Sequence, residues 1–447
     1  MAASLEAAQE TAHALAARGV ELILGTAVDY SGVTRSKGVP VSRLDAFVSS
    51  GMGASPSWVV FCIDFGIAFT PSLGVTGDLR LRLDPHRLTV VDDGIAWAPT
   101  TLHFQDGSIF PGCPRARLVK TLDRLDAAGF SAVTGTELEF VLVAPDGSAL
   151  DDGPWNGYGI RPALRHGSLL TDLARTFEAA GVAVEQIHTE YGSHQVEISL
   201  APADPLTTAD NTVLARILIG RAAERAGLGV SFSPTPFAGG VGNGAHLHLS
   251  LERDGQPVFS GAAGPHGMST TGAAAIAGIV GALPDLQGVL AGSAVSALRL
   301  QPGHWAGAFA CWGLENREAA VRFIEATPSS PGGANVEVKI IDASANPYLA
   351  PTVLLGAALD GIEADQELPP EISVDPATLP DAEKGAIALA AEQATALDRL
   401  EHSARAKSLL GDDIHAGVVA VRRYEQSTYG AETPGFVADA FRLAFSC

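Results

Sequence analysis

The stretch of sequence that decides the fold reads RLQPGHWAGAFACWGLENREAAVR over residues 299–322, and EVKIIDASANPY follows over residues 337–348. The first segment carries three arginines, Arg299, Arg317 and Arg322. In an acidic chain such a cluster favours recognition of phosphate or carboxylate groups, although surface ion pairs with the abundant Asp and Glu explain it equally well. In the second segment Glu337 and Lys339 share one face of a predicted strand.

The composition around these segments is that of a large globular protein. The chain has 447 residues, of which 47% are apolar, and a net charge of -21. This length predicts two domains. The negative charge argues against nucleic-acid and anionic-membrane partners, because both require basic patches. We therefore expect neither a nucleic acid nor a membrane as a partner.

The cysteines and the N-terminus indicate a cytoplasmic location. Four cysteines lie far apart with no CxxC spacing, which is typical of buried thiols in a reducing compartment. Residues 1–19 lack the basic and apolar regions of a signal peptide. The most apolar helical stretch, 274–283, is too short to span a bilayer.

Hydrophobic patterning predicts an α+β protein divided near the proline-containing segment 111–114. We divide the chain into an N-terminal domain, 1–104, and a larger domain, 105–447. Expected helices are 5–18, 44–48, 115–128, 168–180, 206–226, 346–362, 382–399 and 415–426. Expected strands are 21–30, 79–83, 88–91, 131–143, 182–187, 195–200, 244–251 and 336–341. There is no GxGxxG or GxxxxGK[ST] loop, so a dinucleotide fold or a Walker-type phosphate loop has no support.

Two carboxylates stand two residues apart in an otherwise apolar strand. Glu137 and Glu139 lie in the run GTELEF over 135–140, so their side chains share one strand face. Side-by-side carboxylates repel each other, and a divalent cation would neutralise them. A solvent-facing strand edge is the alternative interpretation.

Further ligand-type residues flank glycine-containing turns. His188, Glu190, His194 and Glu197 surround one turn, which is either a ligand set or a polar hairpin. His246 and His248 follow a glycine-rich loop and share a strand face. Together, five glutamates and one histidine on separate strands could build two adjacent oxygen-rich sites suited to Mg²⁺ or Mn²⁺. Metal ions with arginines are typical of phosphoryl transfer from a nucleotide.

These segments, in this order, resemble the glutamine synthetase family over essentially the whole chain. Residues 28–32 resemble its "f-D-x-x-G" turn, 77–84 "S-D-M-x-L-x-P-D", 135–140 "G-x-E-x-E-F", 190–197 "E-x-G-P-G-Q-x-E" and 242–250 "G-S-G-M-H-x-H-x-S". The opening segments resemble "R-L-x-P-G-(Y-E)-A-P … W-G-x-x-N-R-x-x-x-x-R" and "E-x-R-x-x-D-x-x-A-N-P-Y". The resemblance implies a β-grasp domain followed by a catalytic domain, with antiparallel strands in an incomplete barrel flanked by helices. It also implies that the chain assembles into a ring, a homo-dodecamer, with each active site between adjacent subunits.

The resemblance implies a role for each matching residue. One metal takes Glu139, Glu190 and Glu197, and the other takes Glu137, His246 and Glu337. ATP binding falls to Arg317, Arg322, His248 and Ser250. Arg299 and Gly242 match substrate-binding positions, Arg299 holding the α-carboxylate. Asp29 matches the acid lent to a neighbouring subunit's amine site, and with Tyr158 it is our candidate for accepting the amine's proton.

Departures from the family pattern concentrate in the amine half of the site. Trp305 replaces the flap glutamate of "P-G-Y-E-A-P", and an indole packs on an alkyl amine or a cation but accepts no proton. Val241 replaces an asparagine that contacts the substrate amino group. Lys339 replaces an arginine that faces the transferred phosphate, and Thr235 stands where many members have lysine. The adenylylation tyrosine has no counterpart near 365–370.

These observations predict a ligase that uses ATP and two or more Mg²⁺ or Mn²⁺ ions. We expect it to activate the γ-carboxylate of glutamate, or of a similar acid, as an acyl-phosphate and to join it to an organic amine, as the γ-glutamylamide and γ-glutamylpolyamine synthetase-like members do. Two alternatives stay open. One is a genuine glutamine synthetase that uses ammonia, with another acid replacing the flap glutamate. The other is a non-catalytic sensor or assembly protein, against which the full set of metal ligands speaks.

Overall fold

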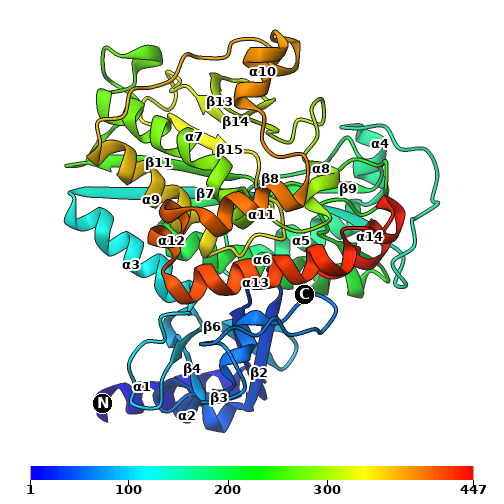
Figure 1. Ribbon diagram of the computed structural model, residues 1–447. Helices are drawn as coiled ribbons and strands as arrows, with labels where there is room; N and C mark the ends of the chain where they lie inside the picture. Colours follow the sequence, from blue (N-terminus) through cyan, green and yellow to red (C-terminus); the bar gives the residue numbers. More distant parts are fainter. Residues whose placement is uncertain (1, 446–447) are drawn as a thin grey trace.

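The computed structural model describes residues 2–445 as an α+β structure built on two β-sheets, which confirms the predicted fold class (Figure 1). The first sheet has six strands. Their order is β2 (Thr34–Pro40), β1 (Leu22–Val28), β6 (Ile95–His103), β4 (Leu79–Leu83) and β3 (Met52–Ala54), with β5 (Thr89–Asp92) also paired to β6. β1 and β6 run parallel, and the other pairs are antiparallel. This mixed sheet, with α1 (Ala2–Ala17) and α2 (Leu44–Ser49), has the arrangement expected of a β-grasp domain.

The second sheet has nine strands and carries the residues of the predicted site. Its order is β13 (Phe309–Leu314), β14 (Ala319–Ile324), β15 (Asn335–Val338), β11 (Leu247–Arg253), β7 (Phe130–Val143), β9 (Gln195–Ala203) and β8 (Val184–Thr189). The short strands β10 (Gly229–Ser231) and β12 (Gln256–Pro257) pair with β7 and β11.

One pair of this sheet departs from the antiparallel pattern that we expected. β13 and β14 are parallel. The segment 315–318 runs from the end of β13 back to its beginning, so that Ala319 lies opposite Phe309. The reversal includes Glu315, whose φ is 50°. The remaining pairs of the second sheet are antiparallel.

Two apolar helices pack closely beside the second sheet. α7 (Thr270–Leu290) and α9 (Leu349–Glu363) touch at glycines: a Cβ at Gly278 would lie 2.2 Å from the Ala357 carbonyl oxygen, and one at Gly361 would lie 2.3 Å from that of Ala274. α7 is 21 residues long, so our expectation of a stretch too short to span a bilayer was wrong about its length. Its most apolar window is 78% buried inside the structure, as befits a core helix.

The expected helix over 382–399 is two helices, α10 (Asp381–Ile387) and α11 (Gln393–His402). Between them the backbone pairs with the edge of the second sheet, where the Leu389 N–H donates to the Ala308 carbonyl. This tertiary pairing overrides the local helix propensity. The remaining α-helices are α3 (Pro114–Ala127), α4 (Ile160–Arg165), α5 (Gly167–Ala179), α6 (Pro205–Arg225), α8 (Ser296–Arg299), α12 (Ala404–Leu410), α13 (Asp412–Tyr429) and α14 (Pro434–Phe441).

The first sheet and its helices form the blue unit at one end of the molecule (Figure 1). α13 faces this unit, and the hydroxyls of Tyr424 and Tyr429 on α13 donate to the Asp64 carboxylate. The segment between β6 and α3 contains the predicted boundary at residue 104. The division into two domains at that residue stays a prediction.

Candidate active site

The register of the second sheet brings the predicted metal-binding carboxylates together. Glu139 on β7 lies opposite Glu197 on β9, and Glu337 on β15 lies opposite His248 on β11. Because alternate residues of a strand face one side, Glu137 joins Glu139 on the same face of β7. Strands far apart in the sequence therefore present their charged side chains to one place.

The first group of ligand atoms surrounds His246, which lies just before β11. Its Nδ1 is 3.3 Å from Glu137 Oε2 and 3.3 Å from Glu337 Oε1. His248 Nε2 is 3.3 Å from Glu137 Oε1. The trio predicted for one metal, Glu137, His246 and Glu337, is thus assembled, and His248 lies beside it.

A second group forms at the turn between β8 and β9. His188 Nε2 lies 2.9 Å from Glu190 Oε1 and 3.8 Å from Glu197 Oε1. Glu139, the third residue predicted here, is held to one side. Its Oε2 accepts hydrogen bonds from the Gly244 N–H at 2.8 Å and from Gln195 Nε2 at 3.1 Å.

The electrostatics of these groups call for added positive charge. Burial and repulsion from Glu137, Glu139, Glu190 and Glu337 raise the pKa of Glu197 to about 9. Burial also opposes ionisation of Glu337, but Lys339, His246 and His248 lower its pKa to about 2. A carboxylate cluster that is mutually repulsive at neutral pH, with imidazole at its centre, has the chemistry of a divalent-cation site.

Two cations approach the cluster from the β14–β15 side. Arg322 Nη1 donates to Glu337 Oε2 at 3.0 Å, and Lys339 Nζ donates to Glu337 Oε1 at 3.1 Å. The strand predicted over 336–341 is shorter in the structure, where β15 ends at Val338. Lys339 therefore lies one residue beyond the strand. Arg317 is not part of this contact: its side chain is exposed on the connection between β13 and β14. Ser250 lies on β11, two residues beyond His248.

Arg299 is a buried cation behind the predicted metal ligands. Its Nη1 and Nη2 donate to the carbonyls of Ile340 and Lys339, each at 3.0 Å, and its Nη2 lies 3.4 Å from His246 Nε2. Gly242 packs against it, since a Cβ there would lie 2.7 Å from Arg299 Cγ. Val241, 41% exposed, lies at the surface of the same loop. Arg299 and Gly242 are thus in contact with each other, and Val241 adjoins them.

The carboxylate of Asp29 makes local contacts in the turn between β1 and β2. It is buried, Oδ1 accepts from the Ser31 and Val33 N–H groups, and Oδ2 accepts from Arg35 Nε at 2.8 Å. Asn346 donates to the Asp29 carbonyl. The role of Asp29 in a neighbouring subunit's amine site stays a prediction.

Tyr158 lies beside the second group. Its ring stacks on His188 at a centroid distance of 6.3 Å. Burial and a hydrogen bond to Glu190 raise the pKa of Tyr158. The expectation that Tyr158 helps to accept the amine's proton stays a prediction.

Trp305 lies in the segment 302–307, which we call the flap. Its backbone is held by Glu318, an acid to which the sequence analysis gave no role. Trp305 has a φ of 53° and its side chain is 57% exposed, while its N–H donates to Glu318 Oε1 at 2.9 Å. Glu318 is buried, and burial raises its pKa. His188 was noted in the sequence but given no role. Its position on a strand, two residues before Glu190, was a sequence signal that it belongs to the site. No local sequence pattern pointed to Glu318.

The sheet and its grouped acidic and histidine side chains form a site with the chemistry of divalent-cation binding. The family model for the glutamine synthetase catalytic domain matches residues 111–435. A gamma-glutamylpolyamine synthetase from Streptomyces coelicolor is 37% identical, with 96% of this chain and 95% of the relative covered. A glutamine synthetase from Pyrococcus horikoshii is 31% identical, with 90% and 88% covered.

Solved structures agree with these sequence relatives. One described as a novel glutamine synthase homologue has a TM-score of 0.85 at 29% identity and covers 95% of this chain and 98% of its own. A GmaS complex with ADP has a TM-score of 0.83 at 27% identity, with 94% and 96% covered. The chain belongs to the glutamine synthetase family, and it is a ligase. The family depends on ATP and divalent metal, and the grouped acidic and histidine side chains fit such ions.

Proposed function

We propose that this ligase joins an organic amine to the γ-carboxylate of glutamate, or of a glutamate-like acid, through an acyl-phosphate. The observation that carries the proposal is Trp305, an exposed indole on the flap where the family pattern has an acid. The similarity to a gamma-glutamylpolyamine synthetase supports it as well.

The strand-borne half of the site would perform the phosphoryl transfer. Two Mg²⁺ or Mn²⁺ ions, when bound, would neutralise the transferring phosphoryl group. Glu139, Glu190 and Glu197 would hold one ion, and Glu137, His246 and Glu337 the other. His248, Ser250 and Arg317 complete our proposed nucleotide contacts. Arg322 and Lys339, which share Glu337 in the structure, would release it to the metal and turn to phosphate oxygens.

Arg299 and the flap would position the two reacting partners. The guanidinium of Arg299 is held by two backbone carbonyls, so its remaining donors have a fixed direction for a substrate carboxylate. Gly242 lets the loop lie against this arginine, and Val241 beside it offers apolar surface in place of an amide. Trp305 would cover the amine, through apolar or cation–π contact with a substituted ammonium. The amine, once deprotonated, attacks the acyl-phosphate carbon, the carbon–oxygen bond to phosphate breaks, and the departing phosphate takes up the proton that the nitrogen releases.

A glutamine synthetase using ammonia is the second candidate, and Glu318 is the observation that favours it. This acid lies under the flap, and its Oε2 is buried without a hydrogen-bond partner among the described residues. If Glu318 replaces the missing flap acid, ammonium becomes the efficient nucleophile. Our proposal assigns Glu318 instead to holding the backbone of Trp305.

The decisive experiment is ATP-dependent phosphate release with glutamate and a panel of nucleophiles. The panel should contain ammonium, short alkylamines, diamines and polyamines, each with a no-amine blank. We expect turnover with an organic amine at concentrations where ammonium gives little. Ammonium turnover equal to that of every amine would overturn the proposal in favour of a glutamine synthetase.

We further propose that the chain assembles in the cytoplasm into a ring, by resemblance a homo-dodecamer, with each active site between adjacent subunits. Apolar side chains gather on the exposed segment between β3 and β4, where Phe65 is 83%, Phe69 53% and Val75 78% exposed. Such a patch is typical of an interface. Asp64, in the same segment, is an exposed acid that this unit could offer to a neighbour. Mass photometry of the active enzyme tests the assembly, and a fully active monomer would contradict it.

A further inference from the structure

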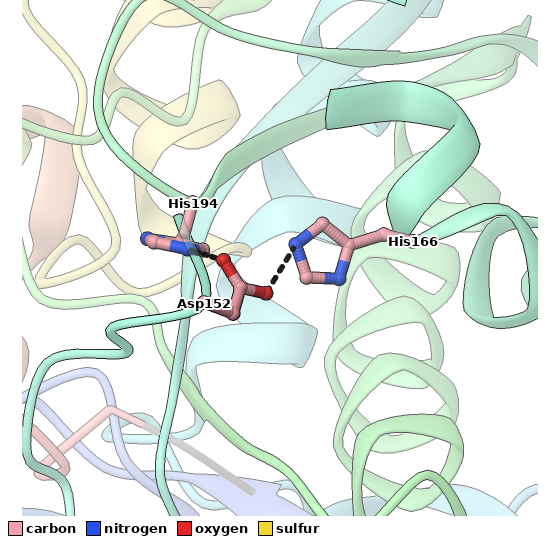
Figure 2. Close-up of side chains that lie close together, drawn as sticks. All are labelled: Asp152, His166 and His194. Atoms are coloured by element: carbon pink, nitrogen blue, oxygen red, sulfur yellow. Dashed lines mark hydrogen bonds and ion pairs between the residues drawn. The ribbon is translucent and has the colours of Figure 1, made fainter. Parts of the chain in front are cut away.

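A third cluster of ligand-type side chains lies outside the predicted ligand sets. Asp152 comes from the segment 144–159, between β7 and α4; His166 joins α4 to α5; and His194 lies in the turn between β8 and β9 (Figure 2). His194 Nε2 is 2.8 Å from Asp152 Oδ1, and His166 Nε2 is 3.7 Å from Asp152 Oδ2. The three ligand atoms all lie within 4.8 Å of one another.

His166 provides an unused ligand atom inside this cluster. The residue is 8% exposed, and its Nε2 has no hydrogen-bond partner among the described residues although it points toward Asp152 (Figure 2). Leaving a buried ring nitrogen unpaired is costly unless a ligand completes it.

His194 is oriented for the same purpose at a cost to the backbone. Its φ of 59° lies in the left-handed region, at a position where the quoted family pattern has glycine. Ser193 Oγ lies 3.0 Å from Nδ1, which leaves Nε2 for the cluster. Trp155 packs beside both imidazoles, with ring centroids 5.0 Å from His194 and 6.0 Å from His166. A second-sphere hydrogen bond and a packed aromatic wall are typical of bound histidine ligands.

We propose that Asp152, His166 and His194 bind a divalent transition metal, zinc in the first instance. Two imidazoles and one carboxylate form a borderline ligand set that suits zinc, unlike the oxygen-rich active site. Zinc bonds of about 2.0–2.2 Å require only small shifts of ligands already grouped this closely. Arg165 Nη1 donates to Asp152 Oδ1 at 2.9 Å. A carboxylate has about four lone-pair positions on its two oxygens, so this bond leaves Oδ2 to bind the metal.

The metal would fasten the segment 144–159 next to the active site. Trp155 Nε1 in this segment donates to the Glu190 carbonyl at 3.1 Å, and Tyr158 stacks on His188. A metal that joins Asp152 to two histidines of the main body therefore holds these contacts in place. Its role is structural, and the zinc-binding test does not require the proposed choice of amine to be correct.

The test uses the full-length chain, first stripped with a chelator and then dialysed against excess Mg²⁺ and low-micromolar Zn²⁺. Excess Mg²⁺ reduces zinc binding at the carboxylate-rich groups, and the difference in bound zinc between the wild type and variants of the third cluster, measured by elemental analysis, reports that cluster. We expect one zinc per chain in the wild type and loss of it in His166→Phe and in His194→Asn. Asn tolerates the left-handed conformation, and Phe keeps the ring volume.

The matched control is His266→Gln. His266 Nε2 lies 2.8 Å from Glu371 Oε2, a histidine–carboxylate pair like that of His194. Within residues 2–445, which the structure describes, this pair belongs to no group that could hold a metal. This variant should retain the zinc. Cobalt added in place of zinc should give visible absorption bands in the wild type and in His266→Gln only. Circular dichroism and thermal unfolding with chelator present establish that each variant is folded.

Two outcomes would overturn the proposal. One is a wild-type protein that keeps no zinc beyond the level of His166→Phe under Mg²⁺ saturation. The other is folded His166→Phe and Asp152→Asn proteins that keep the wild-type amount. In either case the cluster is an ion pair of His194 with Asp152, and zinc, where found, belongs to the carboxylate groups.

Discussion

The proposed metal cluster and the flap would serve the same reaction, but they differ in burial, in backbone conformation and in the contacts that hold them. Glu337 is 2% exposed, lies on a central strand and is held by two cations. Trp305 is 57% exposed, lies on a loop with a left-handed backbone and is anchored through its N–H. A change in the cluster disturbs the sheet and the balance of charge, whereas the flap can exchange an acid for an indole. In the proposed reaction, carboxylate activation by the cluster is thereby separated from the choice of amine by the flap.

The largest expected effect comes from the cluster. Glu337→Gln keeps the side-chain volume but removes the charge that holds Arg322 and Lys339 and that would bind metal. We expect ATP turnover to fall at least about 100-fold, because even the loss of a partner of a metal ligand typically costs ~10–100-fold. The measurement is phosphate release across a Mg²⁺ and Mn²⁺ titration, where excess metal should restore activity only in part.

The matched control is Glu315→Gln, which removes the other carboxylate paired with Arg322. Glu315 is half exposed and outside the metal groups, so turnover should change little. Full turnover of the wild type in a chelated, metal-free sample would refute the two-metal interpretation. Equal losses in the two variants would assign the effect to Arg322 alone.

The next effect concerns the flap and should change the choice of amine more than the rate of activation. Trp305→Glu should shift the ratio of kcat/KM values toward ammonium. Trp305→Ala should weaken the organic amine without improving ammonium. A cation–π or apolar contact of ~0.5–2 kcal/mol corresponds to at most roughly 30-fold in preference. Competition between ammonium and the amine in one reaction, followed by product analysis, measures this ratio.

A suitable control is Phe436→Ala, since Phe436 is a comparably exposed aromatic residue, 51%, on α14. Its amine preference should equal that of the wild type. If the ratio is unchanged in both Trp305 variants, then Trp305 only packs the flap and has no part in amine choice.

The sequence predicted the cluster because strand periodicity is a local property. Glu137 and Glu139 could be placed on one face from their spacing alone, and the family resemblance supplied their partners on other strands. The α+β class and most long helices followed from hydrophobic periodicity in the same way. The site residues that rest on regular strands are therefore the ones the sequence brought closest to their observed neighbours.

What the sequence did not predict depends on contacts between distant segments. The break between α10 and α11 comes from pairing with β13, and the parallel run of β14 comes from the path of 315–318. Asp29 matched a motif, but the motif did not predict the hydrogen bonds that its carboxylate accepts from Ser31 and Arg35 in the turn around it. The link from Glu318 to the flap spans a loop, for which no periodic signal exists.

A smaller effect should follow from Asp29→Asn, and it should appear in stability. The amide would place a donor against Arg35 Nε in a buried turn, at a cost of about 1–3 kcal/mol. We expect a lower unfolding midpoint with kcat per folded enzyme unchanged. Asp106→Asn is the control, because Asp106 makes the same hydrogen bonds to Ser108 in an exposed turn. A large loss of kcat with normal stability would support the predicted catalytic role of Asp29.

The smallest expected effect, in Glu318→Gln, tests whether the flap depends on an acid at all. The glutamine oxygen can still accept the Trp305 N–H, so turnover with the organic amine should stay close to wild type. Loss of activity confined to ammonium would instead favour a glutamine synthetase whose flap acid has moved to Glu318.

The stability of the wild type, relative to this variant, should depend on pH in a direction fixed by the burial of Glu318. Burial raises the pKa of Glu318 from 4.5, so the folded protein prefers the protonated carboxyl. Below pH 4.5 both states are protonated and the wild type keeps this advantage; it is lost as pH rises through the folded-state pKa. The unfolding midpoint of the wild type, relative to Glu318→Gln, should therefore fall between about pH 4.5 and neutrality. The exposed control Glu432→Gln should show no such trend. A relative midpoint that rises with pH would mean that ionised Glu318 stabilises the flap, as a carboxylate held ready for a cation would.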